Sequence, residues 1–250
     1  MTEKMTAFQI AAIALLSFAP FAGSFLGVLA DRLCRDEDVV AKPSACRSCG
    51  TRLRARDLIP VVSFLRLSGR CAACGAAIPR WILLIELAAF ALACVAVALG
   101  RDAVEIWLIA VFLWCLLALF ACDCLWFRLP DLLTGALLAL ALALSLVTGW
   151  PPPGQALVGA AVGAGVFLAL RLAYSGLRGR EGLGLGDVKL MAGLGAAFGP
   201  WDLPLLVLIA ALGALAAAGV TGALHATRAL PFGAALCAAA AVLWTGLRVL

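Results

Sequence analysis

Charged residues are scarce in this chain: Asp, Glu, Lys and Arg make up 13% of its 250 residues, against 65% hydrophobic residues. With a mean hydropathy of +1.10, this composition excludes an ordinary soluble domain. The 19 basic residues outnumber the 14 acidic ones, but their placement points to membrane topology, so no nucleic-acid partner is expected. Histidine is nearly absent. The one example, His225, has no evident metal-ligating partner and is interpreted as structural.

Eight apolar stretches approach the roughly 20 residues that a helix needs to cross the hydrocarbon core of a bilayer. They cover residues 7–30, 81–99, 103–122, 131–149, 155–173, 187–200, 203–223 and 231–248. The sixth is short and glycine-rich, and we expect it to tilt or to span only in part. Breaks are expected at residues 151–154 and 199–200, which are rich in proline and glycine. The sequence therefore predicts an all-α polytopic membrane protein with about eight transmembrane helices.

The basic residues orient the chain, because cytoplasmic loops carry an excess of Lys and Arg. If residues 31–80 are cytoplasmic, only Lys4, Arg101 and Arg248 of the 19 basic residues fall on the other side. Three parts follow: a first transmembrane helix (1–30), a cytoplasmic cysteine-rich domain (31–80) and a transmembrane core (81–250). The alternative for the first segment is a cleaved signal peptide, which would require export of the densely basic loop.

Four of the ten cysteines form two pairs in the polar region, Cys46-Arg-Ser-Cys49 and Cys71-Ala-Ala-Cys74. Two CxxC pairs at this separation are typical of a closed, structural zinc site with four thiolate ligands. A metal would supply much of the folding energy of a loop that has little apolar surface to bury. Two disulfides are the alternative, which the reducing cytoplasm disfavours.

Two aspartates, Asp123 and Asp187, lie where apolar runs meet short polar loops on the side assigned as cytoplasmic. An ionisable group is costly at such a place, so it indicates a function. Asp187 ends the sequence Gly184-Leu185-Gly186-Asp187, whose alternating glycines would let the backbone approach another chain closely. Two facing carboxylates can share a proton and activate a water, which predicts an aspartic protease. On the residues alone, helix capping remains the alternative for Asp187.

Two other charged residues have a functional and a structural interpretation. Lys189 either pairs with the Asp187 carboxylate or extends to the membrane interface. Glu86, inside the second apolar run, either forms an internal ion pair or lines a substrate groove. Asp131 follows Pro130 at the start of the fourth apolar run. A carboxylate is stabilised at the N-terminus of a helix, so this position gives Asp131 a structural role.

Two other classes of function stay open on the residues alone. The first is a transporter or channel that uses the membrane acids as ion sites, although the chain has no obvious inverted repeat to favour it. The second is a membrane scaffold that binds a partner through the zinc loop. Gly159 and Gly163 form a GxxxG motif, which is more typical of helix packing than of chemistry.

Taken together, the motifs resemble those of the prepilin peptidases, or type IV leader peptidases, which are GxGD membrane aspartic proteases. The resemblance covers nearly the whole chain and includes the sequence Gly-Ser-Phe-Leu at 23–26, the cysteine region, Glu86, Asp123 with Leu-Pro-Asp at 129–131, the GxGD element, and Pro-Phe-Gly at 231–233. The chain departs from the family at Gly27, Arg47 and Ala234, where the family often has asparagine, proline and proline.

The resemblance implies an endopeptidase that removes the basic leader from type IV prepilins or pseudopilins at the cytoplasmic face of the bacterial inner membrane. It implies Asp123 and Asp187 as the catalytic pair, and it places Gly184, Gly186, Lys189 and Glu86 in the active-site or substrate region. The partners are then the prepilin or pseudopilin substrate and membrane lipid. Many family members also methylate the new N-terminus with S-adenosylmethionine. The resemblance links methylation to the cysteine loop, but no dinucleotide-type glycine fingerprint is visible here, so this activity stays open.

Overall fold

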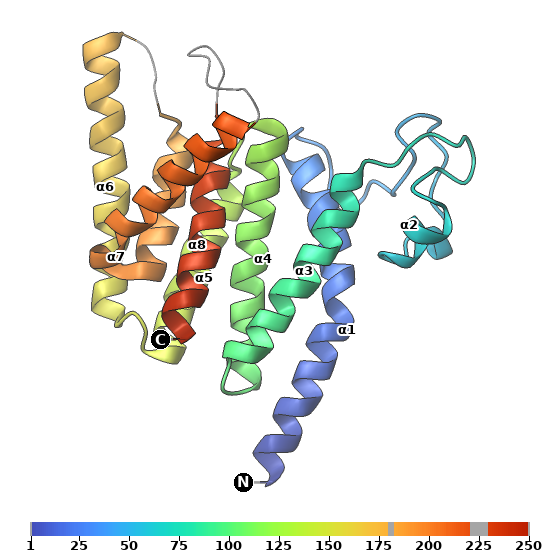
Figure 1. Cartoon of the computed structure of the whole chain (residues 1–250), viewed down its shortest axis with the longest axis horizontal. Coiled ribbons are helices and arrows are strands. Elements are labelled where there is room, and N and C mark those ends of the chain that lie inside the picture. The colour runs from blue at the N-terminus through green and yellow to red at the C-terminus, as the bar shows by residue number, and fades with distance from the viewer. Residues whose placement is uncertain (1, 180–182, 221–229, 250) are drawn as a thin grey trace.

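The computed structural model describes residues 2–179, 183–220 and 230–249, and within these ranges its regular elements are helices (Figure 1). The helices are α1 (Thr2–Leu33), α2 (Val62–Arg66), α3 (Arg80–Leu99), α4 (Ala103–Trp126), α5 (Asp131–Thr148), α6 (Pro153–Arg178), α7 (Leu185–Val220) and α8 (Phe232–Val249), with a 3-10 turn at Ala55–Asp57. His225 and the last three residues of the predicted segment 203–223 lie outside the described residues.

Seven of the described helices, α1 and α3 to α8, are long and apolar enough to cross a membrane. α7 contains both the sixth and the seventh predicted segments, because its backbone leaves helical geometry at Gly199 (φ 73°, ψ 177°), just before Pro200. Both ends of α7 lie on the same side of the bundle, where α6 ends and α8 begins (Figure 1). The expected break at 199–200 is confirmed, and the two apolar segments that it separates form one kinked element.

The chain ends lie at one end of the bundle, and the segment that carries the cysteines leaves α1 and enters α3 at the opposite end (Figure 1). This is the arrangement expected if each apolar segment reverses the direction of the chain. α4 is the central helix, since α1, α3, α5 and α8 all pack against it. Its N-cap is Asp102, whose Oδ1 accepts hydrogen bonds from the Val104 and Glu105 amides at 2.9 Å each.

A buried ion pair joins α8 to α4 on the side of the chain ends. The Arg248 guanidinium lies 3.0 Å from Glu105 Oε1, and the two side chains are 9% and 5% exposed. The same guanidinium stacks on the Trp244 ring, with its Cζ 4.5 Å from the ring centroid. Removing one partner of such a pair leaves an uncompensated buried charge, so this contact fixes the last turn of α8 against the first turn of α4.

The GxxxG motif packs α6 against α7. A Cβ atom at Gly159 would overlap the carbonyl oxygen of Gly195, and one at Gly163 would overlap that of Met191. The two backbones approach this closely because both positions lack a side chain. The interpretation of the motif as helix packing is therefore confirmed.

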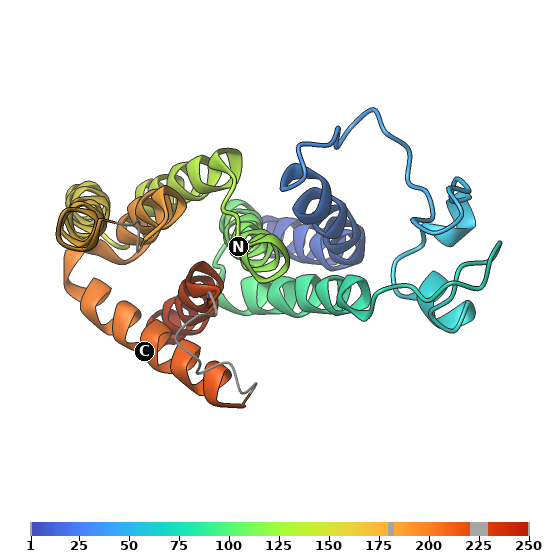
Figure 2. The same cartoon turned by 90° about the horizontal axis from the view of Figure 1, so that it is seen from above.

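The segment between α1 and α3 extends to the side of the bundle and is tied to it by polar contacts (Figure 2). The Arg32 guanidinium donates to the carbonyl oxygens of Asp38 and Pro43, at 3.2 and 3.1 Å, and to that of Lys42. Arg47, one of the departures from the family pattern, forms an ion pair with the buried Asp31 of α1. These contacts dock the first half of the cysteine segment on the end of α1.

Candidate active site

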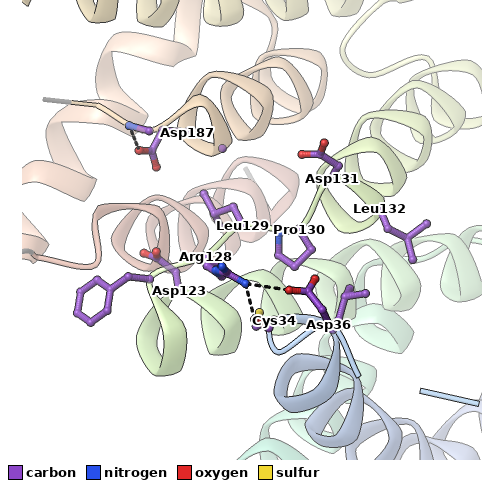
Figure 3. A pocket seen from close by; sticks show the side chains of 13 residues that line it. Cys34, Asp36, Asp123, Arg128, Leu129, Pro130, Asp131, Leu132 and Asp187 are labelled. Carbon is purple, nitrogen blue, oxygen red and sulfur yellow. Dashed lines mark hydrogen bonds and ion pairs between the residues drawn. The ribbon is translucent and has the colours of Figure 1, made fainter. Parts of the chain in front are cut away.

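A cavity of about 480 Å³ opens between the end of α1, the α4–α5 connection and the start of α7. Asp123 and Asp187 both line it, and Figure 3 shows their carboxyl groups on opposite walls of one space. The two groups are near enough for their charges to interact. The structure therefore brings together the two aspartates that the sequence singles out, from helices that are far apart along the chain.

Asp123 lies in the last turn of α4 and is 6% exposed. Its Oδ2 accepts a hydrogen bond from the backbone amide of Ala234, in the first turn of α8, at 2.7 Å. A proline at 234, common in the family, would have no amide to donate, so the alanine of this chain adds a donor.

Asp187 lies in the first turn of α7 and is half-buried. Its Oδ2 accepts a hydrogen bond from the Gly184 amide at 3.2 Å. This is the contact of a helix-capping carboxylate that reaches back to the residue before the helix. The capping and cavity interpretations of Asp187 therefore hold together, because the same carboxyl group caps α7 and faces Asp123.

The two glycines before Asp187 allow a close approach. A Cβ at Gly186 would lie 2.9 Å from Leu129 Cβ, in the α4–α5 connection, and one at Gly184 would lie 3.3 Å from Asp187 Oδ2. Both distances are too short for an ordinary contact. The segment that approaches Gly186 is the connection that follows Asp123 in this same chain. The expected approach of another chain, the substrate, stays a prediction.

Ion pairs link the parts of the cavity rim. Lys189 Nζ lies 2.6 Å from Asp131 Oδ1, which joins α7 to the start of α5. Lys189 is therefore paired with Asp131 and not with Asp187, a correction to one of the two expectations for it. Arg128 donates to the Cys34 carbonyl oxygen at 2.9 Å and lies 3.4 Å from Asp36 Oδ2 (Figure 3).

Glu86 lies away from the two aspartates, in a second cavity of about 210 Å³ between α1, α3 and the cysteine segment. It is 5% exposed, and its Oε2 accepts a hydrogen bond from the Val61 amide at 2.7 Å. Val61 has φ 62° and ψ −53°, a strained conformation for a β-branched residue. Glu86 thus holds a strained turn of the cysteine segment against α3. The expected ion pair of Glu86 is not among the contacts of the described residues, and its place in a substrate groove stays a prediction.

The four paired cysteines converge in two similar turns. All four Sγ atoms lie within 4.8 Å of one another, and those of Cys46 and Cys74 are 3.8 Å apart. Four thiolates about 2.3 Å from one tetrahedral zinc ion would lie about 3.8 Å apart, so the spacing fits a metal better than a disulfide. Gly50 and Gly75 have φ of 70° and 71°, and their amides donate to the Cys46 and Cys71 carbonyl oxygens at 2.9 Å. The cluster therefore has the geometry of a metal site.

The thiols of this cluster have unequal acidities. Hydrogen bonding to the Thr51 hydroxyl and backbone lowers the pKa of Cys49 to about 6. For Cys74, the Ala76 amide lowers the pKa, but contact with the other thiols of the cluster raises it to about 11. Crowded thiols cannot all ionise together unless a cation neutralises them, which is what a bound metal supplies.

Comparison with known protein families and curated proteins gives matches along most of the chain. Residues 18–99 match the bacterial peptidase A24 N-terminal domain, and residues 110–219 match the type IV leader peptidase family. The chain belongs to the type IV leader peptidase family. The cysteine cluster and Glu86 lie in the first of these matches, and Asp123 and Asp187 lie in the second.

Individual relatives of this leader peptidase are named prepilin leader peptidase/N-methyltransferase. The protein from Dichelobacter nodosus is 36% identical over 197 residues, which cover 78% of this chain and 68% of the relative. One from Burkholderia pseudomallei strain 1026b is 37% identical over 250 residues, with coverage of 88% and 80%. One from Dickeya chrysanthemi is 40% identical over 195 residues, with coverage of 77% and 68%. No solved structure matches the chain.

Sequence reasoning did not find the contact between Asp123 and the first turn of α8. The sequence feature that could have indicated this contact is the Pro-Phe-Gly motif at 231–233. The family resemblance included this motif, but no function was assigned to it. A Cβ at Gly233 would lie 3.1 Å from Asp123 Oδ2, which explains the glycine. The last residue of the motif therefore packs directly against Asp123, one of the two aspartates of the cavity.

Proposed function

We propose that this chain is an aspartic endopeptidase that removes the leader peptide from type IV prepilins or pseudopilins, with Asp123 and Asp187 as its catalytic pair. The observation that carries the proposal is that both carboxyl groups line one cavity at the end of the helix bundle. The names of the relatives supply the substrate class.

The pair would act with one proton between its two members. Two nearby carboxyl groups cannot both ionise easily, so one is ionised and the other protonated. The ionised member takes a proton from a water as that water attacks the scissile carbonyl carbon. The protonated member donates a hydrogen bond to the carbonyl oxygen, where negative charge develops. No metal is needed for this step.

The cavity suits a substrate that is half polar and half apolar. It opens at the ends of membrane-spanning helices, so a prepilin could keep its hydrophobic helix beside them while its leader stays outside the bilayer. The excess of basic residues on this side supports its assignment as the cytoplasmic face of the bacterial inner membrane. Residues 31–80 would then form a cytoplasmic zinc-binding domain, with Cys46, Cys49, Cys71 and Cys74 as the ligands.

N-methylation of the new N-terminus with S-adenosylmethionine is proposed as a second activity of the same chain. It is supported by the names of the relatives, which couple leader peptidase with N-methyltransferase. Mass spectrometry of the mature pilin N-terminus decides it, because a methyl group that replaces a hydrogen makes the product heavier by one CH2 unit. An unmodified N-terminus after complete cleavage in the presence of S-adenosylmethionine would contradict this second activity.

The protease proposal is tested by co-expression with a prepilin. The wild-type chain should yield one product, cut between the basic leader and the hydrophobic helix, as measured by mass spectrometry. Asp123→Ala and Asp187→Ala should each abolish that product while the protein accumulates in the membrane at the wild-type level. Normal processing by either variant would refute the assignment, and a transporter or scaffold would give no product even with the wild-type chain.

A further inference from the structure

The first turn of α8 contacts Asp123, but the mechanism proposed above gives this turn no role. Gly233 and Ala234 lie in that turn, where backbone amides have no acceptor inside the helix. The Ala234 amide donates to Asp123 Oδ2 at 2.7 Å. An amide that has no acceptor inside its own helix therefore binds a carboxyl group from a different helix.

This contact favours the charged form of Asp123. A helix N-terminus carries partial positive charge, and hydrogen bonds from its amides to a carboxylate are short and strong. Asp123 is buried, so it needs such donors if it is to carry a charge. The far end of α8 is anchored to α4 by the buried pair of Arg248 and Glu105.

Asp187 has a weaker set of donors. Its hydrogen bond, from the Gly184 amide, is 3.2 Å long and comes from its own chain segment. It faces Asp123 across the cavity, so it experiences the negative charge of that carboxylate. The buried thiol of Cys237, one turn along α8, supplies no positive charge to either aspartate. The surroundings of Asp123 therefore stabilise a negative charge better than those of Asp187 do.

We propose that the first turn of α8 fixes Asp123 as the ionised member of the pair and leaves the shared proton on Asp187. This inference rests on the proposed function and assigns the two roles within it. Asp123 takes a proton from water as the water oxygen bonds to the carbonyl carbon, and Asp187 gives its proton to the carbonyl oxygen. When the C–N bond breaks, the leaving amine takes the proton from Asp123, and the carbonyl oxygen returns its proton to Asp187.

Gly233 is the positioning residue in this arrangement. An added Cβ would lie 3.1 Å from Asp123 Oδ2 and 2.9 Å from Leu129 Cδ1, so it would push the carboxylate off the Ala234 amide. Gly246 lies near the other end of α8, where an added Cβ meets nothing within 4 Å. Gly246→Ala is therefore a matched control for Gly233→Ala, with the same change in helix propensity.

The first experiment compares the kinetics of the two glycine variants on a purified prepilin. Gly233→Ala should lower kcat about tenfold or more and leave KM within about threefold, because the interaction it disturbs acts on the reacting water and not on substrate binding. Gly246→Ala should match the wild type in both constants. Wild-type kcat in Gly233→Ala would overturn the proposal, as would a loss that lies wholly in KM.

The second experiment tests the assignment of the proton directly, and it does not depend on the folding of the glycine variants. An asparagine amide can donate a hydrogen bond to the scissile carbonyl but cannot accept a proton from water. Asp187→Asn should therefore retain a residual kcat about tenfold or more above that of Asp123→Asn. Equal residual rates, or the reverse order, would overturn the assignment. If Asp123→Ala or Asp187→Ala is fully active, the proposed function fails instead.

Discussion

Gly186 lies against Leu129, so that a Cβ added at Gly186 would be 2.9 Å from Leu129 Cβ. Gly186 precedes Asp187, and Leu129 belongs to the connection that follows Asp123. This one contact therefore brings the two aspartate-bearing segments together at the cavity. The contact depends on the absence of a side chain at 186. It therefore explains, by packing within this chain, why the second glycine of the GxGD element is a glycine.

Gly186→Ala should reduce prepilin processing about tenfold or more, because a shift of about 1 Å in one catalytic group is enough to cost that much. The overpacked contact should also cost about 1–3 kcal/mol of stability. Gly176→Ala is the control, since a Cβ there meets nothing within 4 Å. Initial processing rates at equal protein levels measure the effect. Equal rates for the two variants would show that the contact does not position Asp187.

The order of the membrane segments could be predicted from the sequence, because each apolar run is bounded by polar or helix-breaking residues such as Gly199 and Pro200. The cysteine cluster could be predicted because each CxxC pair brings two ligands together locally. These features depend on neighbours along the chain, which is why the structure agrees with the expectations for them.

Contacts between distant helices could not be predicted in the same way. The Ala234 amide and Asp123 are 111 positions apart, and Lys189 and its partner Asp131 are 58 apart. A single sequence does not show which amide or carboxylate of another helix a side chain will meet. For the same reason the sequence could not show that the partner of Glu86 is a backbone amide at Val61 and not a basic side chain.

Loss of a thiol from the cysteine cluster should remove bound metal. The purified wild-type chain should contain about one zinc ion per chain, and Cys74→Ser should lose it, because a site with three ligands and one hydroxyl binds zinc more weakly. Cys94→Ser, which changes an exposed cysteine of α3, is the control. Elemental mass spectrometry measures the zinc content. A wild-type chain purified without chelators that holds no zinc would contradict the site.

Glu86→Gln should loosen the cysteine segment from α3. The neutral amide keeps the shape of the side chain but is a weaker acceptor for the Val61 amide, so we expect a loss of about 1 kcal/mol. Limited proteolysis between α1 and α3 should become about fivefold faster. Glu37→Gln in the cysteine segment changes only partly exposed ion pairs, to Arg35 and Lys42, and should have little effect. Equal cleavage rates in the two variants would rule out the anchoring role of Glu86.

Gly159→Leu should separate α6 from α7. The side chain would overlap the backbone of Gly195, and the helices would have to move apart at a cost of several kcal/mol. Gly165→Leu lies on the same helix with nothing within 4 Å of an added Cβ, so it should keep the wild-type melting temperature in detergent. Similar melting temperatures for the two variants would mean that the close packing of α6 and α7 is absent in solution.

The central claim is that the two aspartates act as one catalytic pair, and a third aspartate of the same cavity provides the sharpest comparison. Asp131 lines the cavity but is largely exposed and paired with Lys189. The decisive measurement is the initial rate of cleavage of a purified prepilin by equal amounts of the three alanine variants. We predict no detectable cleavage by Asp123→Ala and Asp187→Ala, and at least about a tenth of the wild-type rate for Asp131→Ala. Cleavage by Asp123→Ala or Asp187→Ala at the rate of Asp131→Ala would contradict the account.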